Sequence, residues 1–185
     1  PRLLTPGPTP LPERVRLALA QDMIHHRKPG FKKILLETET MLQKLFGTEQ
    51  PVLPLSCSGT GAMTAAVHGL FLPGETVIVV NGGKFGERWS KIAAVRGLKV
   101  VEIDVAWGQA VTPAQVEQAL REHPEAKGVF MQVCETSTAA QHPVEAIARL
   151  TRTREVLLVA DGISAVGISP CPLDAWGIDC LLTGS

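Results

Sequence analysis

The 185-residue sequence contains no tyrosine, a single asparagine (Asn81) and few aromatic residues, which make up 4% of the chain. It also has no excess of charge, because 18 Lys+Arg balance 18 Asp+Glu. Proteins that bind nucleic acid through a basic face need clustered Lys and Arg, and no such cluster stands out. Its apolar runs are a few residues long, far short of the roughly 20 that cross a membrane. These absences argue against nucleic-acid-binding and membrane-spanning classes.

The cysteines and histidines do not follow the spacing of a metal site. The four cysteines form no C-x-x-C pair, and the five histidines form no H-x-x-x-H or H-E-x-x-H pattern. The first segment, PRLLTPGPTPLPERV, lacks the apolar core of a signal peptide. We therefore expect no metal and four reduced thiols, which are typical of a cytoplasmic protein.

The 45% hydrophobic and 19% charged composition is typical of a folded chain. After an irregular, proline-rich opening, helices are expected at 12–23 and 31–46, the second closing on Gly47. Beyond these, short apolar runs alternate with helical segments. The pattern predicts strands at 52–55, 76–80, 98–103, 128–133, 156–160 and 179–182. Between them it predicts helices at 62–72, before Gly97, at 112–121 and at 144–154.

Strands of four to six apolar residues separated by helices of 10–15 residues imply βαβ crossovers. Such strands are buried on both faces, which explains why their apolar runs are continuous. The fold class is therefore α/β with a mainly parallel sheet. Length alone indicates one ordinary domain. However, the chain stops on the strand-like run 181–185, an abrupt end for a sheet.

Ligands of open parallel sheets bind outside the carboxyl ends of the strands, so the segments that follow each strand matter most. Most of these segments are rich in glycine and hydroxyl groups, one supplies a carboxylate and one an aromatic ring. They are 56–61, 81–86, 134–138, 161–164 and 183–185.

The first of these segments, SCSGTGAM, lies between an expected strand and a helix. Its glycines, free N–H groups and helix dipole would suit a phosphate, although a plain helix cap without a ligand remains open. A dinucleotide-binding pattern is disfavoured, because Thr64 takes its third glycine position and Asn81 stands where an acid is required. No G-K-[ST] follows, so a P-loop is disfavoured as well.

Three other positions have both a structural and a functional interpretation. Asp161 either caps the next turn or is a buried carboxylate kept ionised by a cation. Phe85 is either a core residue or a ring that stacks on a flat ligand. Thr136 and the two hydroxyl residues after it are either turn residues or a polar ligand edge. Together, the anion cradle, ring, hydroxyls and carboxylate describe a site for a flat, phosphorylated, cationic heteroaromatic, and pyridoxal phosphate matches.

Seven segments of the sequence carry a family resemblance. The segments TPGPTPLP, HRKPGF, SGTGAM, NGGKFGERW, ETSTA, ADGISAVG and LLTGS occur in this order over essentially the whole chain. In them the sequence resembles the class V aminotransferases, which are fold-type I pyridoxal-phosphate enzymes, and in particular the alanine–glyoxylate and serine–glyoxylate (serine–pyruvate) group. The resemblance implies an N-terminal arm and first helix at 1–30. It implies an incomplete three-layer pyridoxal-phosphate-binding large domain at 31–185, and a small C-terminal domain absent from this chain.

The resemblance also implies how individual residues meet the cofactor. Thr60, Gly61 and Ala62 would present backbone N–H groups to its phosphate, assisted by the Thr60 hydroxyl. Phe85 would stack on one face of the pyridine ring, and Ile163 would press on the other face.

Four further roles follow from the same resemblance. Thr136 would hydrogen-bond the phenolic oxygen of the ring, and Asp161 would hold the pyridine nitrogen protonated so that the ring acts as an electron sink. Gly7 would border the substrate pocket, and Ser185 would belong to the cofactor-binding Thr-Gly-Ser run.

In the resembled family, the lysine that forms the Schiff base would fall two positions beyond Ser185, and the arginine for the substrate carboxylate lies further on. Neither Lys84 nor Lys91 follows the expected strand, so neither replaces it. We therefore expect these residues to be a segment of a longer polypeptide.

The activity implied by the resemblance is transfer of an amino group from a small amino acid (alanine, serine or aspartate) to a 2-oxo acid such as glyoxylate or pyruvate. Other fold-type I enzymes remain alternatives: a phosphoserine aminotransferase, a lyase, or a desulfurase, against which Phe85 speaks because desulfurases usually have His there. The non-enzyme alternative is an inert pyridoxal-phosphate-binding fragment. A cytoplasmic homodimer with sites near its interface is implied as well.

Overall fold

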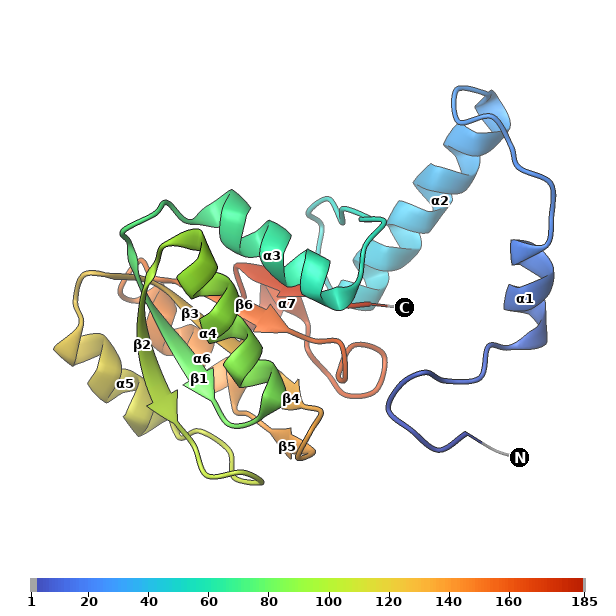
Figure 1. Cartoon of the computed structure of the whole chain (residues 1–185). Helices are drawn as coiled ribbons and strands as arrows, with labels where there is room; N and C mark the ends of the chain where they lie inside the picture. The colour runs from blue at the N-terminus through green and yellow to red at the C-terminus, as the bar shows by residue number, and fades with distance from the viewer. Residues whose placement is uncertain (1–2, 185) are drawn as a thin grey trace.

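The computed structural model describes residues 3–184, and a five-stranded parallel sheet forms its centre (Figure 1). The strand order is β2-β1-β3-β6-β7, and each neighbouring pair is parallel. A separate antiparallel pair, β4–β5, follows β3. The main strands are β1 Thr76–Asn81, β2 Lys99–Asp104, β3 Ala126–Gln132, β6 Leu157–Asp161 and β7 Cys180–Leu182, and the short pair is β4 Cys134–Glu135 and β5 Ala140–Gln141. The α/β class and the mainly parallel sheet are confirmed.

Helices cover both faces of the sheet and produce three layers. Val77 and Val79 of β1 pack in one apolar cluster with α3 and α4, whereas Ile78 and Val80 pack in a second cluster with α5 and α6. The β1 side chains are buried on both faces, so its apolar run is continuous rather than alternating. The covering helices are α3 Gly59–Leu70, α4 Lys84–Arg96, α5 Pro113–Glu122 and α6 Val144–Arg152, and the short α7 Leu173–Trp176 follows β6.

Helix ends follow the chemistry expected from the sequence. Thr112 and Gln115 form a reciprocal capping box at the start of α5. Gly47 and Gly97 end α2 and α4 with φ of 62° and 85°, a left-handed conformation that glycine adopts without a Cβ clash.

One expected strand is absent, and two expected helix ends are misplaced. The segment 52–55 is not a strand, since Pro51 and Pro54 lack the N–H groups that a ladder needs and Leu53 is 77% exposed. The first helix, α1 Glu13–Leu19, ends well before Met23, because none of its residues is buried and no packing extends it. The α3 helix also starts three residues earlier than expected, at Gly59.

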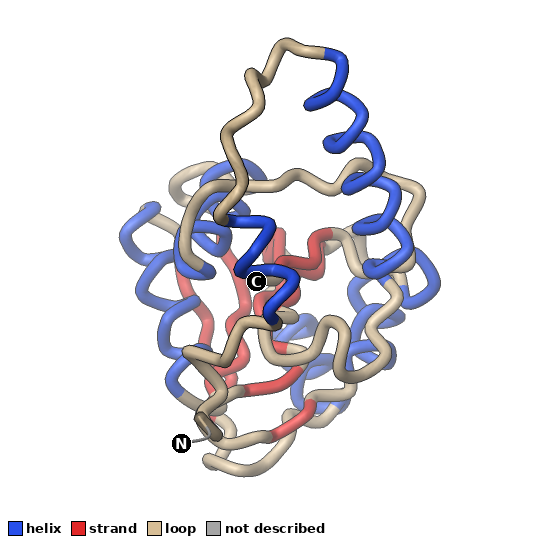
Figure 2. The backbone as a smooth tube through the Cα atoms, turned by 90° about the vertical axis from the view of Figure 1, so that its right-hand side faces the viewer, coloured by secondary structure: helices blue, strands red, loops and turns tan. Residues whose placement is uncertain are grey.

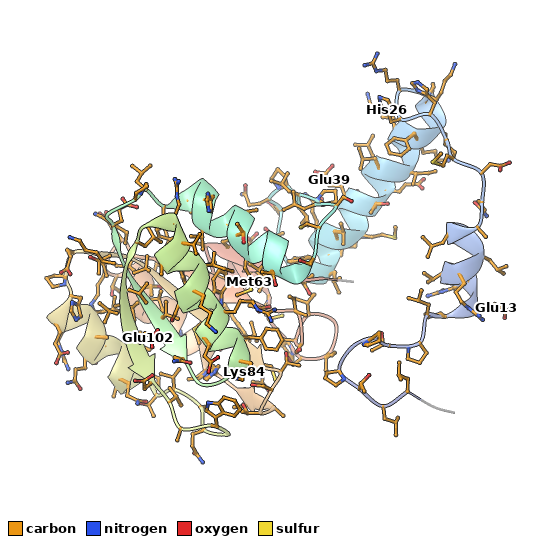
Figure 3. The ribbon with its side chains drawn as sticks, in the orientation of Figure 1. Glu13, His26, Glu39, Met63, Lys84 and Glu102 are labelled. Carbon is orange, nitrogen blue, oxygen red and sulfur yellow. The ribbon has the colours of Figure 1, made fainter. Side chains whose placement is uncertain are left out.

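The N-terminal region projects from the three layers (Figures 1 and 2). It consists of an extended segment, α1 and α2 Pro29–Phe46, and Phe46 is the one buried residue of these two helices. Figure 3 shows Glu13 and His26 far from the sheet. The base of α2 is fastened by Asp174, which accepts hydrogen bonds from Thr48 Oγ1 at 2.7 Å and from the Glu49 N–H at 3.0 Å. None of the helices described in residues 3–184 has the length and apolarity to span a membrane.

Gly86 sets how closely α4 approaches β1. A Cβ at this position would lie 2.7 Å from the Val80 carbonyl oxygen and 2.8 Å from the Asn81 Cα. We therefore expect Gly86→Ala to push α4 off the sheet and lower the free energy of unfolding by roughly 1–3 kcal/mol. The measurement is urea unfolding followed by circular dichroism.

Gly69 of α3 provides the matched control, because a Cβ there has no neighbour within 4 Å. Gly69→Ala should leave stability unchanged or raise it by up to about 1 kcal/mol, the usual helix gain. Equal effects of the two alanines would contradict the close approach at Gly86.

Candidate functional site

The carboxyl ends of the parallel strands gather most of the residues singled out from the sequence. Asp161 ends β6, and Thr136 follows β4. Phe85 and Thr60 lie in the first turns of α4 and α3, whose N-terminal halves are marked in Figure 3 by Lys84 and Met63. Ile163 follows β6 and lies so near the start of α3 that a Cβ on Gly59 would collide with its Cδ1.

The start of α3 retains uncommitted hydrogen-bond donors. Ser58 caps the helix, its Oγ accepting from the Gly61 N–H at 3.2 Å and its carbonyl from the Ala62 N–H at 3.0 Å. Two of the three N–H groups predicted for phosphate are thus engaged within the helix cap. Within residues 3–184, no acceptor is bonded to the N–H groups of Gly59 and Thr60. These two N–H groups lie at the positive end of the α3 dipole and are directed toward the site.

Asp161 is a buried carboxylate, 4% exposed, and few hydrogen-bond donors offset the cost of burying its charge. Its Oδ1 accepts the Ile163 N–H at 2.9 Å, so it both caps the next turn and lies buried. Loss of solvent raises the pKa of Asp161 to about 6, an effect that the Ile163 N–H opposes, nearby Glu135 reinforces and Arg88 weakens. A cation placed against this carboxylate would restore its charged form.

Phe85 is held in place by Glu135, whose side chain is 0% exposed. Glu135 Oε2 accepts the N–H groups of Phe85 and Gly86, each at 3.1 Å, and so caps the N-terminus of α4. Its Oε1 accepts from the Ser137 N–H at 3.1 Å and from Ser137 Oγ at 2.6 Å. Sequence reasoning saw Glu135 only as a neighbour of three hydroxyls, because its partners on α4 lie about 50 residues earlier.

Arg88 is a site residue that sequence reasoning missed. Its Nη1 donates to Thr60 Oγ1 at 3.1 Å, and its guanidinium carbon lies 4.7 Å from the centre of the Phe85 ring. The available signal was spacing, because residues three apart on a helix share a face and Arg88 follows Phe85 by three.

Three further predicted residues remain: Thr136, Gly7 and Ser185. The hydroxyls of Thr136 and Ser164 share a hydrogen bond, so Ser164 joins the polar edge. Gly7 lies exposed on the N-terminal arm, where a Cβ would have no neighbour within 4 Å, and it is not brought to the site. Ser185 lies outside the described residues.

The described residues fit pyridoxal phosphate. The free N–H groups and hydroxyl at the start of α3 are donors suited to a phosphate. The Phe85 ring and the Ile163 side chain are apolar surfaces suited to a flat ring. Asp161 is an acceptor suited to a protonated pyridine nitrogen. In the same region of the chain, 3–184, no group of three or more potential metal ligands gathers.

Comparison with known proteins gives a consistent picture. The family model described as "Aminotransferase class-V" matches residues 6–185. A soluble hydrogenase small subunit from Synechococcus sp. is 36% identical, over 99% of this chain and 48% of its own length. A serine–glyoxylate aminotransferase from Methylorubrum extorquens is 31% identical, over 99% of this chain and 47% of its own length. This chain thus spans about half the length of the curated relatives it matches.

Solved structures show the same partial coverage. An aspartate aminotransferase of subgroup IV from Thermus thermophilus superposes with a TM-score of 0.93 and 36% identity. The match covers 100% of this chain and 52% of that structure.

The capping role of Glu135 can be tested by an amide. Every hydrogen-bond partner of this carboxylate is a donor, so the NH₂ of Glu135→Gln would face N–H groups. We expect a loss of roughly 2–4 kcal/mol in the free energy of unfolding, measured by denaturant titration.

Glu145 is the matched control, since it is exposed and paired with Arg149 on the surface of α6. Glu145→Gln should change stability by less than about 0.5 kcal/mol. A Glu135→Gln protein as stable as this control would show that the buried carboxylate does not hold α4.

Proposed function

Because this chain belongs to the class V aminotransferase family, we propose that it contributes the cofactor site of a pyridoxal-phosphate-dependent aminotransferase. The reaction is transfer of an amino group from alanine, serine or aspartate to a 2-oxo acid such as glyoxylate or pyruvate. The substrate range follows the names of relatives, among them the serine–glyoxylate and aspartate aminotransferases.

One observation carries the proposal more than any other: a buried carboxylate that forms no ion pair in the described part of the chain lies on the same rim as free N–H groups suited to a phosphate. Asp161 is 4% exposed, and among residues 3–184 the cation that lowers its pKa is Arg88, whose effect is smaller than that of burial. An isolated buried charge is costly, so its presence favours a positively charged ligand. A protonated pyridine nitrogen supplies that charge.

Each side chain has a defined task in this arrangement. Thr60 and the N–H groups at the start of α3 bind the phosphate, while Phe85 and Ile163 enclose the ring and exclude water. Thr136 and Ser164 offer hydroxyls to its polar edge, and Asp161 keeps the ring nitrogen protonated. When bound, pyridoxal phosphate supplies an electron sink for the carbanion formed at the substrate's α-carbon.

The name of the Synechococcus relative refers to a hydrogenase. The phosphate-type donors at the start of α3 and the buried Asp161 carboxylate favour amino transfer, however. Phe85 in the ring-stacking position likewise favours a transaminase over a desulfurase-like reaction.

A homodimer is part of the proposal, because the N-terminal region through α2 exposes apolar side chains that the other described residues do not cover. They include Leu11, Leu17, Leu19, Met23, Ile34, Leu36 and Met41. A group of large apolar side chains left exposed in one region favours an interface. We place the enzyme in the cytoplasm, which fits four cysteines that are all free thiols.

The activity test uses the intact protein, including any residues beyond these 185. Purified protein supplied with pyridoxal phosphate is assayed with alanine, serine and aspartate against glyoxylate, pyruvate and 2-oxoglutarate. Amino transfer with at least one small donor is expected, accompanied by a donor-dependent change in the cofactor's absorbance. Absence of any cofactor band after reconstitution would overturn the proposal.

Asp161→Asn should separate cofactor binding from stability. In cofactor-free protein the folded state keeps the Asp161 proton up to about pH 6, whereas the unfolded chain releases it near pH 3.8. Stability therefore falls as pH rises through this window, by roughly 3 kcal/mol in total. The asparagine variant should lose this fall, be more stable than wild type at pH 7, and bind pyridoxal phosphate more weakly.

Denaturant titrations between pH 4 and 7, paired with cofactor titration, check both effects. Asp104→Asn is the matched control, because Asp104 ends β2 with an exposed side chain. It should follow the wild-type pH profile and bind cofactor normally. Parallel pH profiles for all three proteins would show that Asp161 carries no burial cost.

A further inference from the structure

Arg88 connects the two helix N-termini that border the site. It extends from the second turn of α4, donates from Nη1 to Thr60 Oγ1 on α3 at 3.1 Å, and lies over the Phe85 ring at 4.7 Å. Its side chain is half-buried and forms no ion pair with a carboxylate in the described part of the chain. The contact with Thr60 is therefore its main polar interaction within the protein.

The direction of this hydrogen bond constrains the Thr60 hydroxyl. A guanidinium has five N–H donors and no acceptor, so the hydroxyl oxygen must be the acceptor in the pair. The hydroxyl's own proton is then left to donate elsewhere. Thr60 is helical, and the one hydrogen bond of its hydroxyl within residues 3–184 is the bond accepted from Arg88. The Thr60 carbonyl is itself engaged, because it accepts from Thr64 Oγ1 at 2.9 Å.

We propose that Arg88 is a positioning residue that fixes the Thr60 hydroxyl as a hydrogen-bond donor to the cofactor's phosphate. The hydroxyl then adds a third donor to the uncommitted N–H groups of Gly59 and Thr60. The positive charge beside it strengthens the O–H as a donor to an anion. This inference rests on the proposed function, because it assigns a device to the phosphate end of that same site.

A second arginine on the same helix shows what a purely structural contact is like. Arg96 donates from Nε at 3.2 Å and from Nη2 at 3.1 Å to the Phe71 carbonyl oxygen, and so ties the end of α4 to the end of α3. Its partner is a backbone carbonyl that has no proton to redirect. Arg96→Met is therefore the matched control for Arg88→Met.

The test compares ligands with and without a phosphate. Apoprotein of the intact wild type is titrated with pyridoxal phosphate and with pyridoxal, using quenching of tryptophan fluorescence, and inorganic phosphate is used as a competitor. The same titrations are made on Arg88→Met, Arg88→Lys, Thr60→Val, the Arg88→Met/Thr60→Val double variant and Arg96→Met.

Arg88→Met should lower the affinity for pyridoxal phosphate and for inorganic phosphate about tenfold, which is the effect of one lost hydrogen bond to a charged group. The affinity for pyridoxal should change less than about twofold. Thr60→Val should have the same effects. The double variant should bind phosphate as well as either single variant does, because both substitutions remove the same oriented hydroxyl donor and their effects do not add. Arg88→Lys, which also donates to Thr60, should restore part of the phosphate preference, and Arg96→Met should keep all of it.

Other outcomes overturn the inference. If Arg88→Met lowers the affinity for pyridoxal as much as the affinity for pyridoxal phosphate, Arg88 acts through packing or through the Phe85 ring. If the two single losses add in the double variant, Arg88 and Thr60 act independently. If Arg88→Met does not fold, Arg88→Lys and Thr60→Val decide the question by their phosphate preference. Failure of the wild type to bind pyridoxal phosphate would instead overturn the proposed function.

Discussion

The site depends on the hydrogen bonds between the buried carboxylate of Glu135 and the start of α4. This carboxylate lies beyond the central strand β3 and is fully buried. One of its oxygens accepts the N–H groups of Phe85 and Gly86 in the first turn of α4, and the other accepts from Ser137. A helix dipole and several N–H donors offset the cost of burying this charge. Glu135 thereby fixes the start of α4, which in turn places Phe85 over the site and directs Arg88 toward α3.

A second buried carboxylate has the opposite character. Asp161 accepts one backbone N–H, and burial shifts its pKa toward neutrality. Glu135 lies on the same rim, and its negative charge adds to the rise in the pKa of Asp161. Glu135 therefore has its charge offset by several donors, whereas Asp161 has one backbone N–H among the described residues.

The N-terminal arm follows a different logic. Its apolar side chains face water, α1 buries no residue, and Asp174 fastens only the base of α2. The apolar pattern predicted both helices, although α1 ends before Met23, and such a pattern describes an apolar face without saying what covers it.

Local chemistry in the sequence determined much of this protein. Glycine at the ends of α2 and α4, the Thr112 capping box and the continuous apolar runs predicted the parallel α/β fold, since each acts over a few residues. The rule that ligands bind beyond strand ends then indicated Thr60, Phe85, Thr136 and Asp161. Tertiary structure decided the rest: the cap that Glu135 forms on α4, the Arg88–Thr60 bond and the absence of a strand at 52–55. These depend on contacts between residues far apart in the chain, which no local pattern records.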